Sequence, residues 1–162
     1  MSDKKIEDFL YNKTLIYLGK FPSTKKGISQ YLKNYTFKQS FKKKFNQSFN
    51  FNLICENIIT KLETFNLINE SQYLESLINF YGSKHYSIKQ IKLTLQKKGF
   101  ETDVIDIEFH TYMIENPDYE INNLKRFMKR KGIINLEVKD DINRIFKQGF
   151  SEKTIARLRE II

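Results

Sequence analysis

Cysteine is almost absent from this sequence, in which Cys55 is the only one among 162 residues. A single cysteine excludes an internal disulfide framework and is typical of a chain that works in a reducing cytoplasm. Cys55 shares an expected helix with Ile54, Ile58 and Ile59 and has no nearby histidine. A small core residue is therefore favoured over a nucleophile.

Long hydrophobic runs are also missing. No stretch approaches 18 consecutive apolar residues, so no membrane span is expected. The first ten residues, MSDKKIEDFL, carry acids and lack the apolar core of a secretory signal. We therefore expect a cytoplasmic protein with no membrane partner.

The patterns that usually mark an enzyme do not occur. His85 and His110 lie far apart and lack cysteine or carboxylate neighbours at ligand spacing, so no metal site is expected. Gly99 and Gly149 fit helix ends, because neither belongs to a Gly-x-Gly-x-x-Gly or Walker pattern. The sequence predicts a protein without catalysis and without a cofactor.

Helical periodicity dominates what is present. Ser87 and Gln90 form a capping-box pattern, and Ile91 and Leu95 follow on one face before Gly99 ends the helix. The same unit recurs at 142–161, and a weaker copy begins at residue 24. No β-alternating run of useful length appears, so the prediction is an all-α protein.

Three copies of a helical unit indicate tandem modules. We expect three three-helix repeats with helix–turn–helix-like cores, in an elongated, curved array. Their predicted bounds are 1–66, 67–116 and 117–162, with a Phe/Lys-rich insertion near 34–51. A helix–turn–helix shape alone does not imply DNA binding.

The insertion contains Phe37, Phe41, Phe45 and Phe49, each four residues apart. Four residues advance about 400° around a helix, so such a stripe drifts by about 40° per step. We favour a helix extended to about Phe45 over an ordered loop. The stripe could pack as core or offer an exposed partner surface, and both interpretations stay open here.

Positive charge gathers at the two ends of the chain. The net charge is +9, with +8 in residues 1–50, −3 in 51–117 and +4 in 118–162. This placement indicates contact with a polyanion or with an acidic partner. Lysine supplies 23 of the 28 basic residues, and an AT-rich genome would produce such a composition without selection for binding.

The candidate binding residues are the clustered cations. They are Lys42, Lys43, Lys44, Lys84, Lys89, Lys97, Lys98, Lys125, Arg126, Lys129 and Arg130. The helix dipole is enough to explain Lys97 and Lys98 at a helix end. The last four form like-charge pairs at i,i+4, which destabilise a helix slightly unless an anion compensates.

Taken in order, these motifs resemble the RecX regulatory proteins. The first family phrase is matched loosely by Thr14, Tyr17, Leu18, Thr24, Gly27, Ile28, Tyr31 and Leu32. The next phrases are matched by Ile58, Ile59, Leu62, Leu67, Ile68, Asn69, Glu70, Tyr73 and Leu74, then by Ile91, Leu95, Lys98, Gly99 and Phe100. The last phrase is matched by Gly149, Phe150, Ser151 and Ile155. The family's arginine and glutamate are lost from the later part of the first phrase, which begins at Thr24, and the insertion near 34–51 departs from the family pattern.

The resemblance implies a regulator that binds the RecA–single-stranded-DNA filament and modulates recombinase activity in DNA repair and the SOS response, with inhibition as the expected effect. RecA is then the partner, and the backbone of single- or double-stranded DNA is a further one. An alternative is a helical protein that binds DNA without RecA. A third is a helical scaffold whose charge reflects genomic bias alone.

Overall fold

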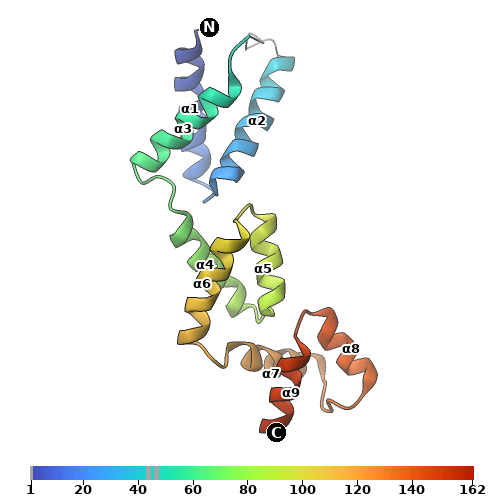
Figure 1. The fold of residues 1–162 in the computed structure, drawn as a ribbon. Helices are drawn as coiled ribbons and strands as arrows, with labels where there is room; N and C mark the ends of the chain where they lie inside the picture. The colour runs from blue at the N-terminus through green and yellow to red at the C-terminus, as the bar shows by residue number, and fades with distance from the viewer. Residues whose placement is uncertain (1, 43–44, 46–47) are drawn as a thin grey trace. The chain divides into compact units, whose positions relative to one another are not determined.

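The computed structural model describes residues 2–42, 45 and 48–162, and this part of the chain contains nine α-helices and no strand. The prediction of an all-α protein is confirmed. The helices are α1 (Asp3–Leu18), α2 (Lys25–Phe41), α3 (Phe51–Thr64), α4 (Glu70–Ser83), α5 (Ile88–Lys97), α6 (Thr102–Glu115), α7 (Tyr119–Lys131), α8 (Lys139–Lys147) and α9 (Glu152–Ile161) (Figure 1).

Short polar side chains start five of these helices, and Asn69 does so for α4 by accepting from the Gln72 N–H at 3.0 Å. Thr24, Asn50, Ser87 and Ser151 each accept a hydrogen bond from the backbone N–H three residues later, at 3.0–3.2 Å. Such a cap satisfies a donor that the first turn leaves without a helical partner, and it stabilises a helix by about 1 kcal/mol. The local sequence therefore determines where these helices begin.

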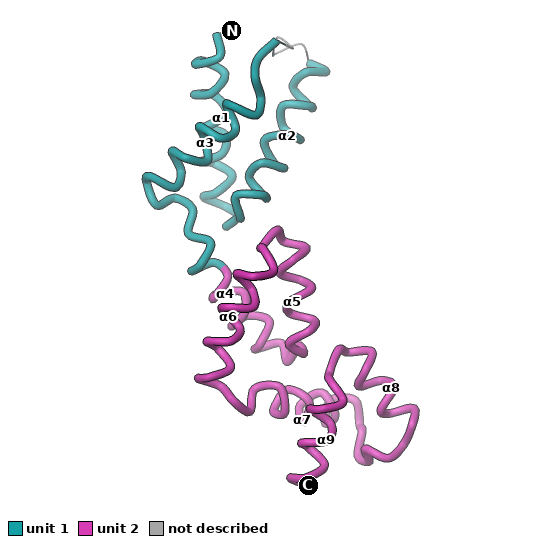
Figure 2. The backbone as a smooth tube through the Cα atoms, in the orientation of Figure 1, with its two compact units in different colours: residues 1–73 teal, residues 74–162 magenta. Residues whose placement is uncertain are grey.

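The chain divides into two compact units. Unit 1 comprises residues 1–73 and unit 2 comprises residues 74–162 (Figure 2). The predicted division into three repeats, at 1–66, 67–116 and 117–162, stays a prediction.

Unit 1 packs α1, α2 and α3 around one apolar core. The fully buried side chains include Leu10 from α1, Leu32 from α2 and Ile58 from α3. Cys55 is buried in the same core with its Sγ 3.4 Å from the Ser29 hydroxyl. The interpretation of Cys55 as a small core residue fits this position.

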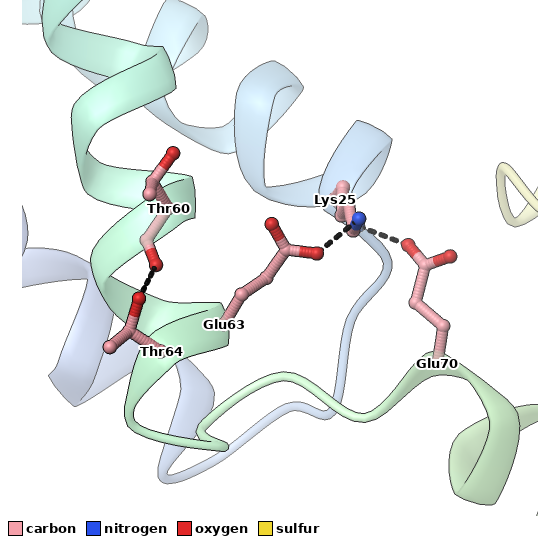
Figure 3. Close-up of polar contacts among 5 residues, drawn as sticks. All are labelled: Lys25, Thr60, Glu63, Thr64 and Glu70. Atoms are coloured by element: carbon pink, nitrogen blue, oxygen red, sulfur yellow. Dashed lines mark hydrogen bonds and ion pairs between the residues drawn. The ribbon is translucent and has the colours of Figure 1, made fainter.

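Lys25 connects three elements of unit 1 at the start of α2 (Figure 3). Its ammonium forms an ion pair with Glu63 near the end of α3. Its backbone N–H donates to Glu70 Oε1 at 2.6 Å, at the first residue of α4. The Glu63 carboxylate holds the pKa of Lys25 above its usual value, so the ammonium stays charged.

The phenylalanine stripe splits into a buried half and an exposed half. The helix α2 ends at Phe41, four residues before the predicted end near Phe45, so that prediction is wrong. Phe45 is buried, with its ring 5.8 Å from that of Phe9 and 5.9 Å from that of Phe49. Because the stripe drifts around the helix, leaving the helix after Phe41 allows the later two rings to turn into the core, while Phe37 stays exposed.

Unit 2 contains most of α4 together with α5 to α9, and its parts are joined by buried polar contacts. Ser87 is fully buried, and its hydroxyl donates to the Gln148 carbonyl oxygen at 2.7 Å while it accepts from the Gln90 N–H. Gly149, with φ +90°, allows this approach, because a Cβ there would lie 2.6 Å from the Ser87 Oγ. The start of α5 thus lies directly against the turn between α8 and α9.

Candidate partner-binding surface

The helix α7 has one buried side and one exposed side. Ile121, Leu124, Phe127 and Met128 are buried in the core that α7 shares with α8 and α9. The helix ends where Gly132 adopts φ +66°, and the Ile133 N–H bonds back to the Met128 carbonyl at 2.9 Å. The apolar side fixes the rotation of α7, so the direction of the opposite side is fixed as well.

The exposed side of α7 carries four cations. Lys125, Arg126, Lys129 and Arg130 are all exposed. At about 100° per residue they occupy an arc of about 140°, centred opposite the buried residues. We call these four residues the α7 basic face.

The α7 basic face lacks local neutralisation. In the part of the chain that the structure describes, none of its four cations forms an ion pair. The last turn of a helix favours cations, which accounts for Lys129 and Arg130 but not for Lys125 and Arg126. The two i,i+4 pairs cost about 0.2–0.5 kcal/mol each. An anionic partner would relieve this repulsion.

The turn between α4 and α5 lies beside this face. Asn123 is 2% exposed and donates from Nδ2 to the Tyr86 carbonyl oxygen at 3.1 Å. The Arg126 guanidinium lies 3.3 Å from His85 Nδ1, and His85 itself has φ +62°. Lys84 is exposed in the same turn. The buried amide and the Arg126–His85 contact therefore hold beside α7 a turn that carries one more cation.

A cavity of about 370 Å³ opens beside the first turns of α7. Its lining includes the Tyr112 and Tyr119 rings, packed edge to face at 5.2 Å, together with Asn122 and Arg126. Burial raises the pKa of Tyr119 to about 12, so this phenol is neutral at physiological pH. Asp118, whose carboxylate pairs with Arg157 at 2.9 Å, also lines the cavity, so its polar lining carries one acidic and one basic side chain.

Four other predicted candidates lie on other elements of the described chain. Lys42 is exposed at the end of α2, in unit 1, and Lys43 and Lys44 lie outside the described residues. Lys89 is exposed in the first turn of α5. Lys97 and Lys98 are exposed at the other end of that helix, about 15 Å along its axis from Ser87.

Sequence reasoning missed the residues that orient the surface. Nothing in the spacing of His85 indicated a contact with Arg126, which is 41 residues away. Asn123 had one usable signal, because it is a polar residue between the apolar positions Ile121 and Leu124. A buried amide in such a place needs a hydrogen-bond partner, although the sequence does not say which one.

Comparisons with known proteins bear on the fold. No family model matches the chain, and no curated protein matches its sequence. Among solved structures, the chain is similar to the crystal structure of RecX from Lactobacillus salivarius, with a TM-score of 0.71 and 20% identity over 95% of this chain and 94% of that one.

A crystal structure of a regulatory protein RecX gives a TM-score of 0.70 and 17% identity, over 99% of this chain and 78% of that one. The chain has the RecX fold. The resemblance seen in the helix caps and core positions of the sequence is thereby confirmed at the level of the fold.

Among the described residues, no group of three or more His, Cys, Asp or Glu side chains could hold a metal ion. Within the same residues, no helix combines the length and apolarity that crossing a bilayer requires.

Proposed function

We propose that this protein is a RecX-type regulator that binds the RecA filament on single-stranded DNA and inhibits the recombinase. In this proposal it limits filament growth and damps strand exchange and ATP hydrolysis during DNA repair and the SOS response. A regulator of RecA acts in the cytoplasm, where we expect this protein.

The α7 basic face is the observation that best supports the proposal. Four exposed cations on one rigid helix, none with an ion pair among the described residues, suit a polyanionic surface. A RecA filament on DNA offers phosphates at regular spacing, and the likeness of the fold to RecX supports this choice of partner.

The same face would also suit DNA alone, which is the second candidate function. Basic side chains that neutralise phosphates release counterions, and this affinity does not require a recombinase. The two candidates differ in one measurable way. A direct DNA-binding protein binds bare DNA tightly at moderate salt, whereas a filament regulator needs RecA.

Charge reversal on α7 tests the proposal. The variant K125E/R126E/K129E/R130E should bind the RecA filament weakly while keeping its helicity by circular dichroism. If each cation meets one phosphate of a single strand, the salt slope falls by about 3. Between 50 and 200 mM salt, the wild type should then lose about 50-fold more affinity than the variant.

A matched control separates this face from net charge. K5E/K20E/K139E/K153E changes the net charge by the same amount at four exposed lysines elsewhere. The control should keep most of the filament affinity and most of the salt slope. Equal losses in the two variants would show that total charge, and not the α7 basic face, determines binding.

A further inference from the structure

Two exposed apolar faces of this protein carry opposite charge. The first lies at the end of α2, where Phe37 and Phe41 are 63% and 74% exposed. Their rings meet edge to face at 4.8 Å. Lys33, Lys38 and Lys42 flank them, and α2 contains no acidic residue. We call these five residues the α2 aromatic face.

The second face lies on α6. Val104, Ile107, Thr111 and Ile114 share an arc of about 80° around the helix. Ile107 and Ile114 are 68% and 69% exposed, and Val104 is also exposed. The spacing of three and four residues is that of an a/d seam, which normally packs against another helix. We call these four residues the α6 stripe.

Acids flank the α6 stripe. Glu108 and Glu115 lie within about 60° of Val104 on one side, and Asp103 lies on the other. No lysine or arginine occurs in α6. In a chain with a net charge of +9, this is an acidic helix with an apolar seam.

We propose that the α2 aromatic face of one copy docks on the α6 stripe of a second copy. Phenylalanine rings would cover the aliphatic seam, while the lysines of one face meet the carboxylates of the other. A nucleic acid would satisfy the α2 aromatic face but would leave the acidic stripe uncovered. A second copy covers both faces with a single kind of contact.

This contact joins two different surfaces, so it is heterologous. Each docked pair keeps one free α2 aromatic face and one free α6 stripe. Further copies therefore add head to tail, and they form either a ring or an open row. Because this self-association requires neither RecA nor DNA, its test is independent of the test of the proposed regulatory function.

The interface is small and polar at its edges. Each side offers only two or three large apolar side chains, which places the contact among weak interfaces below about 1,200 Å². Its flanking charges are exposed apart from Glu108, which is half-buried, so salt weakens the contact. We expect reversible association that grows with protein concentration.

Two complementary variants test the proposal. F37Q/F41Q removes the α2 aromatic face and keeps the α6 stripe, and I107Q/I114Q does the reverse. Sedimentation velocity is run from about 1 μM to about 1 mM, a range that brackets weak dissociation constants. The wild type should show increasing mass, and each variant alone should stay monomeric. An equal mixture of the two variants should form a 1:1 complex that grows no further.

A control removes two exposed apolar side chains elsewhere. I16Q/L53Q changes two exposed residues of α1 and α3, and this variant should associate as the wild type does. A wild type that stays monomeric over the whole range overturns the proposal. So does association that only one of the two test variants loses, which would indicate a symmetric contact.

Two more outcomes contradict the proposal. If both variants are monomeric alone and form no complex when mixed, the two faces do not bind each other between copies. If the wild type binds a dT oligonucleotide through Phe37 and Phe41 and never self-associates, the α2 aromatic face serves nucleic acid instead.

Discussion

Replacing Gly149 by alanine tests whether the start of α5 and the turn between α8 and α9 form one packed body. Gly149 has φ +90°, and an added Cβ would lie 2.6 Å from the Ser87 Oγ and 3.3 Å from the Lys89 Cβ. That hydroxyl donates to Gln148 and accepts from the Gln90 N–H. The methyl group therefore strains the backbone and also displaces a hydroxyl that makes two hydrogen bonds.

The expected loss follows from these two effects. A left-handed conformation costs an alanine about 1–2 kcal/mol. Losing two hydrogen bonds costs about 0.5–1.5 kcal/mol each. Gly149→Ala should thus lower the free energy of unfolding by about 2–5 kcal/mol. Gly132→Ala is the matched control, because Gly132 has φ +66° and nothing lies within 4 Å of its added Cβ, so only the strain remains.

Urea unfolding of the full chain, followed by far-ultraviolet circular dichroism, measures both losses. A double-mutant cycle then isolates the contact. In a Ser87→Ala background the hydroxyl is gone, so Gly149→Ala should cost about as much as Gly132→Ala. Equal losses for Gly149→Ala and Gly132→Ala in the wild-type background would refute the close approach.

Three other predictions concern the two units. Glu7 accepts a hydrogen bond from Lys61 at 2.5 Å, which lowers the pKa of Glu7. Its stabilisation is present above the unfolded pKa and is lost as pH falls through the folded pKa. Glu7→Gln should therefore lower the free energy of unfolding by about 0.2–1 kcal/mol near neutral pH, with a difference that vanishes in acid. Phe45→Ala should lower the free energy of unfolding by about 3–5 kcal/mol, whereas Phe41→Ala should change it by no more than about 0.5 kcal/mol. Urea midpoints measure both changes, and equal changes would contradict the division of the stripe into a buried and an exposed half. Burial raises the pKa of Tyr119 to about 12, so the stabilisation is complete below the unfolded pKa and is lost as pH rises from the unfolded pKa to about 12. Tyr119→Phe should remove a late step from the ultraviolet titration of tyrosine, and an unchanged titration would contradict this burial.

The sequence predicted the helices well because their ends depend on single residues. Ser87 and Ser151 start α5 and α9, and each caps its helix through its own side chain. Gly99 and Gly149 have positive φ at the ends of α5 and α8. These are local effects, so a reading of neighbouring residues is sufficient.

The end of α2 could not be predicted in the same way. Phe45 lies four residues after Phe41, and periodicity alone favours continuing the helix. The position of Phe45 depends on Phe9, which is 36 residues earlier and whose ring lies 5.8 Å away. A tertiary contact of this kind overrides the local pattern.

The candidate site was predicted in part. The like-charge pairs on α7 were visible in the sequence, and the structure leaves all four cations exposed on one side. The contribution of the turn before α5 was not visible, because it rests on contacts of Asn123 with Tyr86 and of Arg126 with His85. Such long-range pairs leave no spacing signal in a single sequence.

The most direct test of the proposed function is the single-stranded-DNA-dependent ATPase rate of RecA. This protein is titrated into preformed filaments at amounts well below one copy per recombinase, beside the charge-reversed α7 variant. The proposal predicts a strong drop in rate with the wild-type protein and little change with the variant. An unchanged rate across this titration, together with tight binding to bare DNA in a parallel assay, would contradict it and favour direct DNA binding.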